Sequence, residues 1–224
     1  MRLNSTKILF LFVAVCAFTH VYGQGTRTRI DSVFSVAERY VNTYETTNRN
    51  DGALFDYWRA YAGDYANKMK VGGKQLAHCG FAVYAIFYEA GYKIPIKEWG
   101  RAYNYTQCVP VTNIGKQAYA LAIGKVKPTN VIIYAPLKGW FSGYHVGILR
   151  EKFPTYATVY ESNTSTKGSV YPVVKKYDGY YLKIRPYWIM WKAVDCLCNS
   201  VPSDLTKVKN LKTNYLQNFK PAKR

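Results

Sequence analysis

Four side chains that could together attack an amide bond are spread over the middle of the sequence. Cys79 is a candidate nucleophile, His145 a candidate general base and acid, and Glu161 a candidate partner for the imidazole, with Asn163 nearby as an assisting amide. A thiol, an imidazole and a carboxylate or amide in series can form a thioester with a carbonyl carbon and then hydrolyse it. We therefore expect acyl transfer at Cys79, provided that the fold brings these residues together.

The segment around Cys79 has the pattern of a buried helix. Its apolar residues recur at three- and four-residue spacing, Gly91 follows as a stop signal, and the helix is predicted to begin near Ala77. Unpaired backbone N–H groups and the positive end of the helix dipole would favour the thiolate of Cys79. Taken alone, such a cysteine is more often a small buried side chain or half of a disulfide, so the other residues must decide.

His145 opens a predicted strand in which Val146 and Ile148 alternate inward. The histidine then shares the opposite face with Gly147, which adds no bulk there. A strand histidine beside a glycine is usually structural, and only its occurrence together with Cys79 favours catalysis.

Glu161 and Asn163 stand two residues apart at the end of a further predicted strand, so they are expected to share one face. His78 is the second choice of base. On a helix it would point about 100° away from Cys79.

Residues 1–23 have the features of a secretory signal, with Arg2 and Lys7 ahead of an apolar run and a cleavage site at Val21–Gly23. We expect one hydrolase domain at 24–192 and a basic tail at 193–224. No second apolar run reaches the roughly 18 to 20 residues of a membrane helix. The expected protein is secreted or periplasmic, monomeric and without a transmembrane span.

The chain is strongly basic, with a formal net charge of +18. Loss of Arg2 and Lys7 would leave 29 basic and 13 acidic side chains, a charge of about +16. Such a balance favours a polyanionic partner. Because the chain is expected to be exported, an anionic cell-wall polymer or a membrane surface fits better than nucleic acid. The alternative is a solvated basic surface that only keeps the protein soluble.

The cysteines that follow the predicted signal suggest one disulfide. Neighbours in a C-x-C spacing would close a strained ring, so we expect Cys108 to pair with Cys196 or Cys198 and Cys79 to stay free. Only two histidines follow the predicted signal, and with no C-x-x-C pair this argues against a zinc site. No metal and no cofactor are expected.

The order of the predicted elements gives an α+β class, with N-terminal helices packed on a C-terminal antiparallel sheet. Helical patterns cover 30–44 and 54–61 before the Cys79 helix, and 93–127 are expected to cross the surface with a short helix at 117–123. The predicted strands of the meander are 131–134, 144–149, 158–161, 169–174 and 181–184.

Three of these segments together resemble the CHAP family of cysteine- and histidine-dependent amidohydrolases and peptidases: Cys79–Gly91, the His-Val-Gly-Ile strand, and Glu161–Thr164. The resemblance covers roughly residues 30–190 and is supported by Asn50-Asp51-Gly52 ahead of an aromatic helix. It departs from the family where tryptophan usually precedes the cysteine and phenylalanine stands three residues after it; here these positions are His78 and Ala82. Thr129-Asn130 also replaces the usual Gly-Asp.

The resemblance implies a papain-like fold and cleavage of peptidoglycan, as an N-acetylmuramoyl-L-alanine amidase or a peptide endopeptidase. It makes Cys79 the nucleophile, His145 the base and acid, Glu161 the orienting group and Asn163 its assistant. We expect Cys79→Ala and His145→Ala to abolish turnover, and Glu161→Gln to cost less because it keeps a hydrogen-bonding partner. A noncatalytic wall- or polyanion-binding relative, and an acyltransferase or toxin with the same pair, remain alternatives.

Overall fold

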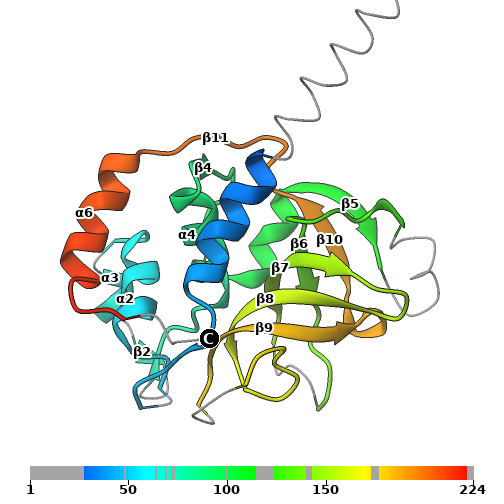
Figure 1. The fold of residues 1–224 in the computed structure, drawn as a ribbon, viewed down its shortest axis with the longest axis horizontal. Coiled ribbons are helices and arrows are strands. Elements are labelled where there is room, and N and C mark those ends of the chain that lie inside the picture. The colour runs from blue at the N-terminus through cyan, green and yellow to red at the C-terminus, as the bar shows by residue number, and fades with distance from the viewer. Residues whose placement is uncertain are drawn as a thin grey trace, which may run out of the picture.

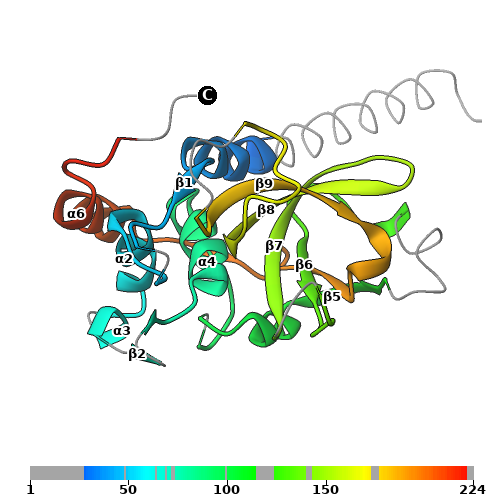
Figure 2. The ribbon, with the colours of Figure 1, turned by 90° about the horizontal axis from the view of Figure 1, so that it is seen from below.

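The computed structural model describes residues 28–47, 49–63, 65–68, 70–71, 74–98, 100–114, 124–139, 143–172 and 177–220 of the chain. Helices gather on one side and a large sheet forms the other, with helix α4 (Cys79–Glu89) between them (Figures 1 and 2). The fold is therefore α+β, as the sequence predicts. The papain-like arrangement within this class stays a prediction.

Helix α4 is central because its sequence is apolar or small on every face. All residues from Cys79 to Tyr88 are buried, which is typical of a helix enclosed by other elements. It begins at Cys79 rather than near Ala77, and Gly91 follows its end with a φ of 100° that glycine adopts readily. The other helical elements of the described ranges include 28–39, α2 (Ala53–Ala60), α3 (Tyr65–Lys68), η1 (Ala102–Gln107), η2 (Tyr187–Ile189) and α6 (Leu205–Tyr215).

The first helix is shorter than its pattern predicts. It ends at residue 39 instead of Tyr44. A turn stops it, because Asn42 has a φ of 66° and the Thr43 hydroxyl donates to the Tyr40 carbonyl at 2.8 Å. Thr43 and Tyr44 then form strand β1 (Thr43–Tyr44) at one edge of the sheet.

The large sheet has the strand order β1-β9-β8-β7-β6-β10-β5, and all of its pairings are antiparallel. The predicted meander is confirmed for the four strands from β6 to β9, which follow one another both in sequence and in space. The strands besides β1 are β5 (Val109–Asn113), β6 (Val131–Tyr134), β7 (His145–Lys152), β8 (Tyr156–Thr164), β9 (Gly179–Pro186) and β10 (Lys192–Asp195). Two short pairs lie outside it: β2 (Lys70–Val71) with β3 (Lys74–Gln75), and β4 (Tyr92–Lys93) with β11 (Val201–Pro202).

The strand predicted at 169–174 is wrong as far as the structure describes it. Ser169 forms only an isolated bridge with Lys183, and the following residues up to 172 form no strand. Pro172 has no N–H to continue a ladder. Residues 173–174, like the helix predicted at 117–123, lie outside the described part of the chain.

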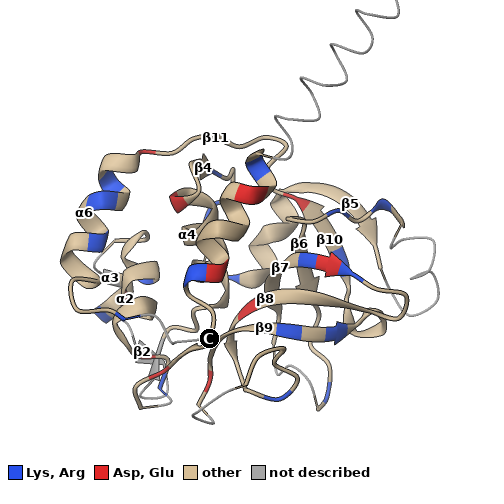
Figure 3. Ribbon diagram, viewed as in Figure 1, with Lys and Arg blue, Asp and Glu red and all other residues tan. Residues whose placement is uncertain are grey.

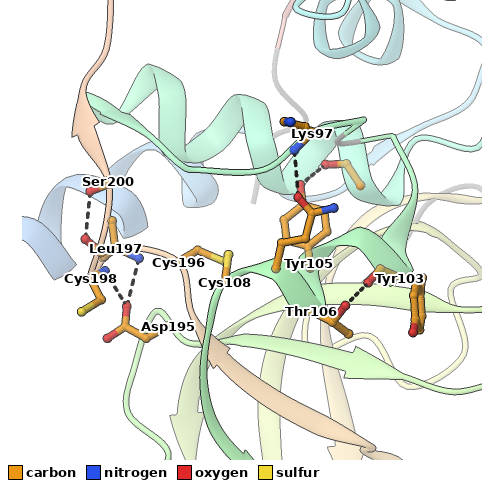
Figure 4. The surroundings of a disulfide bond; sticks show 12 residues. Lys97, Tyr103, Tyr105, Thr106, Cys108, Asp195, Cys196, Leu197, Cys198 and Ser200 are labelled. Atoms are coloured by element: carbon orange, nitrogen blue, oxygen red, sulfur yellow. Dashed lines mark hydrogen bonds between the residues drawn. A yellow bond between two sulfur atoms is a disulfide. The ribbon is translucent and has the colours of Figure 1, made fainter.

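The segment 93–127, which was expected to cross the surface, contains a strand that was not predicted, because β5 pairs with β10 at the edge of the large sheet. The Cys108–Cys196 disulfide joins the start of β5 to the end of β10, with an S–S distance of 2.11 Å (Figure 4). This confirms the expectation that Cys108 pairs with one of the last two cysteines. Cys79 is free and buried, and Cys198 is free and exposed.

The segment predicted as a basic tail contains ordered elements. Residues 193–195 belong to β10, and helix α6 lies beside α2 and α4 (Figure 1). Asp204 caps α6 by accepting from the backbone N–H groups of Thr206 and Lys207. Nζ of Lys212 forms a salt bridge with Oε1 of Glu89 in α4 at 2.5 Å. Within the described residues, no helix has the length and apolar character needed to cross a membrane.

The two faces of the sheet bury separate cores. Alternate residues such as Val131, Ile133, Val146 and Ile148 join the core that contains α4. Their neighbours in sequence, such as Ile132 and Leu149, join a smaller core on the other face. Tyr134, which lies opposite His145 in the pairing of β6 with β7, also joins this smaller core.

Candidate active site

Cys79 is the first residue of α4 and is 5% exposed. The first backbone hydrogen bond of the helix runs from the N–H of Ala82 to the carbonyl of His78 at 2.9 Å. The N–H groups of Cys79 and Gly80 lie ahead of that bond, at the positive end of the helix dipole. Tyr105 fixes this turn, because its hydroxyl donates to the Gly80 carbonyl at 2.6 Å.

His145 is brought to Cys79 by the register of the sheet. It is the first residue of β7, lies opposite Tyr134 of β6, and is 5% exposed. Its Nε2 is 3.2 Å from Oε2 of Glu161. Burial lowers the pKa of His145, but hydrogen bonds to Cys79 and Glu161, and the charges of both, raise it to about 9. The imidazole is therefore protonated at neutral pH and interacts with both the thiol and the carboxylate.

Glu161 is buried and all of its acceptor capacity is used. Its Oε1 accepts from the Tyr134 hydroxyl at 2.7 Å and from Nε of Arg185 at 2.9 Å. Its Oε2 accepts from Nη2 of Arg185 at 2.5 Å and faces His145. Burial raises the pKa of Glu161, but the charge and hydrogen bonds of Arg185 outweigh it and hold the pKa well below its usual range. The carboxylate is a fixed negative charge behind the imidazole.

Asn163 occupies a different position from the one predicted. The pairing of β8 with β9 shifts register between Ser162 and Thr164, and Asn163 has a φ of 60°. This bulge interrupts the alternation that would have put Asn163 and Glu161 on one face. The Asn163 Oδ1 is buried without a hydrogen-bond partner in the described part of the chain. It lines a cavity of about 440 Å³ together with Thr164 and Arg185, and its assisting role stays a prediction.

His78 is not available as a base. It is fully buried, its Nδ1 is 2.5 Å from the Ser162 hydroxyl, and its Nε2 is 3.0 Å from Oε1 of Glu45. Burial, with the charges of Arg59 and His145, lowers its pKa well below 6.5. His78 is therefore a neutral ring with both nitrogens in use, and the structure leaves the reactive position to His145.

Sequence reasoning missed the two residues that hold Glu161. Arg185 reaches it across the β8–β9 pairing, and Tyr134 reaches it from β6, on the far side of β7. A weak signal was present, since Arg185 adjoins a predicted strand and an arginine is rarely buried without a carboxylate partner. The register that selects Glu161 as that partner is not visible in the sequence.

A group of partly exposed rings lies next to the site. Tyr103, Tyr144 and Trp191 have ring centroids 5.0 to 6.3 Å apart. Tyr103 is 50% and Tyr144 is 43% exposed, and Nζ of Lys192 lies 4.3 Å from the Trp191 ring centroid. Tyr144 immediately precedes His145, so this aromatic group lies at the start of β7.

Comparison with known proteins adds no relative: no protein-family model, curated protein or solved structure matches the chain. The resemblance to the CHAP family therefore stays a prediction from the residues named above, and the function is inferred from the geometry of the site itself.

Gly147→Ala should weaken the site without touching a reacting group. A Cβ at this position would lie 2.7 Å from the Tyr160 carbonyl oxygen and 2.8 Å from Cγ of Glu161. The backbone oxygen could move away only if strand β8 shifted. We therefore expect a loss of about 1 to 3 kcal/mol in the free energy of unfolding and a lower kcat. The matched control is Gly143→Ala, because a Cβ there meets nothing within 4 Å. Denaturant unfolding of both variants tests this, and equal stability of the two would contradict it.

Stability should fall as the pH drops below about 6.5. An unfolded chain protonates His78 near its ordinary pKa of 6.5, whereas the folded protein resists because burial lowers that pKa. The unfolded state then binds more protons, so acid favours unfolding. Glu161 adds to the loss below its ordinary pKa of 4.5, because its folded pKa is depressed. Thermal unfolding from pH 7 to pH 4 measures this, and the step near pH 6 should be missing in His78→Asn.

Proposed function

We propose that this protein is a cysteine hydrolase that cleaves an amide bond through a thioester. The observation that carries the proposal is the series in which a free cysteine at a helix start interacts with His145, while Glu161 holds the imidazole from behind at 3.2 Å. A nucleophile, a base and an orienting group in this order are the requirements for acyl transfer.

The reaction follows from the positions of these groups. The Cys79 thiolate adds to the carbonyl carbon, and backbone N–H groups at the start of α4 stabilise the oxyanion. The His145 imidazolium gives its proton to the leaving amine as the carbon–nitrogen bond breaks. The neutral ring then takes a proton from water, whose oxygen attacks the thioester and releases the carboxylic acid and the thiolate. With Nε2 held by Glu161, Nδ1 is the nitrogen that serves the sulfur and the substrate.

We propose peptidoglycan, or another anionic cell-wall polymer, as the substrate and partner, met in the secreted or periplasmic space. The support is the net charge of +18 and the predicted signal at 1–23, which lies outside the described residues. Helix α6 contributes Lys207, Lys209 and Lys212 and contains no acidic residue (Figure 3). Attraction between such a surface and an anionic polymer weakens as salt is added.

The aromatic group of Tyr103, Tyr144 and Trp191 would add apolar contact for a substrate longer than the reacting bond. We expect Tyr103→Ala to raise KM by about two- to tenfold, the scale of one lost aromatic contact, with kcat nearly unchanged. The matched control is Trp188→Ala, which removes a 45% exposed ring. Trp188 lies beside Tyr156, the first residue of β8, whereas Glu161 lies near the other end of that strand. Initial rates over a range of substrate concentrations measure this. An unchanged KM in Tyr103→Ala would remove the aromatic group from the substrate path.

The proposal is tested by release of soluble fragments from purified peptidoglycan, with the new amino termini identified by mass spectrometry. Cys79→Ala should release none. Cys198→Ala should match the wild type, because within the described residues it removes the other free cysteine, which is exposed. Cleavage that disappears only in Cys79→Ala supports the hydrolase and names the bond. If the proteins bind the wall and none cleaves it, the hydrolase proposal fails and the noncatalytic alternative takes its place.

A further inference from the structure

A second hydrogen-bonded cluster lies directly behind the candidate active site. It joins Glu45 after β1, His78 before α4 and Ser162 on β8, and these side chains are at most 1% exposed. A serine, a histidine and a glutamate in series also occur in serine hydrolases. Here no substrate could reach the hydroxyl, because both the serine and the histidine are enclosed. The cluster must therefore act through its neighbours.

Those neighbours are two members of the candidate active site. His78 precedes Cys79, and Ser162 follows Glu161. The 2.5 Å contact between His78 Nδ1 and the Ser162 hydroxyl therefore connects the start of α4 to β8. His145 connects the same two elements, because it interacts with Cys79 of α4 and Glu161 of β8. The contact of His78 with Ser162 is a hydrogen-bonded link between the start of α4 and β8 that involves none of the reacting groups.

Further contacts fix the orientation of the His78 ring. It stacks on Phe55 of α2 with centroids 4.0 Å apart and an interplanar angle of 20°. Glu45 accepts from its Nε2 side at 3.0 Å, while the other carboxylate oxygen accepts the Asn50 N–H at 2.8 Å. Nη1 of Arg59 donates to the Leu76 carbonyl at 3.1 Å, which holds the segment leading to α4.

The protonation of the cluster is consistent with these contacts. The carboxylate of Glu45 accepts a hydrogen bond from Nε2–H of His78. Nδ1 of the neutral ring then carries no proton and accepts a hydrogen bond from the Ser162 hydroxyl. Arg59 and His145 are charged groups near His78, and together with burial they keep it neutral. The neutral ring can thus hold Ser162 and Glu45 at once.

We propose that His78 is a positioning residue, which sets the position of the Cys79 thiol against His145 through its hydrogen bonds to Ser162 and Glu45. The proposal rests on the proposed function of Cys79 and His145, and it assigns a role to the residue that stands where the CHAP family usually has tryptophan. A displacement of about 1 Å at reacting groups can lower a rate by about 100-fold, so a small shift of α4 would be measurable.

The test is the pH dependence of Cys79 alkylation by iodoacetamide, in a Cys198→Ser background with the disulfide intact. Ser162→Ala removes only the hydroxyl. The matched control is Thr158→Val, which removes a buried hydroxyl from the same strand. The Oγ1 of Thr158 has no hydrogen-bond partner in the described part of the chain. We expect Ser162→Ala to slow alkylation at pH 7 by about tenfold and to change its pH profile, because the raised pKa of His145 depends in part on its contact with Cys79. Thr158→Val should keep the profile of the parent protein.

His78→Asn provides a second variant, and the double variant His78→Asn/Ser162→Ala should be no slower than the slower single variant, because both act through one hydrogen bond. Variants that melt at lower temperature but keep the parent alkylation profile would overturn the proposal and leave His78 a purely structural residue. The assay uses no wall substrate. A failure of the proposed hydrolase function would therefore appear as absent cleavage, with the alkylation result unaffected.

Discussion

His145→Ala is expected to lower kcat by about 10⁴-fold or more while the protein still folds. The imidazole supplies both the proton for the leaving amine and the base for water, and loss of such a group removes the covalent route as a whole. The fold should survive because Glu161 keeps Tyr134 and both hydrogen bonds from Arg185. Turnover of a wall fragment and thermal unfolding, measured on the same preparation, test the two parts of this expectation.

Cys79→Ala is the comparison for this variant, because the two side chains act as one unit. The double variant should be no slower than either single variant. In the parent protein, activity should fall as the pH rises through about 9, where the raised pKa of His145 marks the loss of its proton. The alkaline decline is read from kcat between pH 7 and pH 10. Full activity in either single variant would refute the mechanism.

The sequence predicts well the elements whose pattern is local. Helix α4 and strands β6 to β9 follow from apolar spacing, β-branched residues and the stop at Gly91. Strand β10 was missed because Val194 is its one β-branched residue, and β5 was missed because it contains Pro110. Their pairing depends on contacts between residues about 80 positions apart, and such contacts leave no periodic signal. The Cys108–Cys196 disulfide was the one long-range link that residue types suggested.

The candidate site was predictable only in part for the same reason. Cys79, His145 and Glu161 could be found because their residue types and local elements are informative, and the structure brings them together. Asn163 was placed by assuming unbroken alternation, which a bulge interrupts. Arg185 needed the strand register. The hydrogen bonds that occupy both nitrogens of His78 could not be predicted, because they come from Glu45, just after β1, and Ser162 of β8.

Glu161→Gln is expected to be among the most damaging single substitutions in stability, an effect that the sequence-based expectation did not address because it compared only the loss of turnover. Each carboxylate oxygen faces two donors, so the amide nitrogen of a glutamine would oppose two of them in either orientation. Arg185, 6% exposed, would keep its charge without a carboxylate. Breaking a buried ion pair from one side costs about 3 to 5 kcal/mol, a large share of the roughly 5 to 15 kcal/mol that stabilises a typical domain.

The control for Glu161→Gln is Glu89→Gln. Glu89 is also a buried carboxylate, with a side chain 3% exposed, and it pairs with Arg39 and Lys212 away from the site. Both variants should lower the midpoint of urea unfolding, but only Glu161→Gln should lower kcat at a temperature where each remains folded. A free energy of unfolding for Glu161→Gln within about 0.5 kcal/mol of the parent value, the spread of neutral surface changes, would contradict the expectation.

A second substitution separates the two roles of Glu161. In Glu161→Gln/Arg185→Gln the uncompensated charge is gone, so part of the lost stability should return. Activity should not return with it, because His145 still lacks the negative charge that raises its pKa and fixes its ring. Recovery of stability without recovery of kcat would show that Arg185 serves the fold through Glu161, whereas Glu161 serves both the fold and the imidazole. If both recovered together, the loss of activity in Glu161→Gln would be a consequence of instability alone.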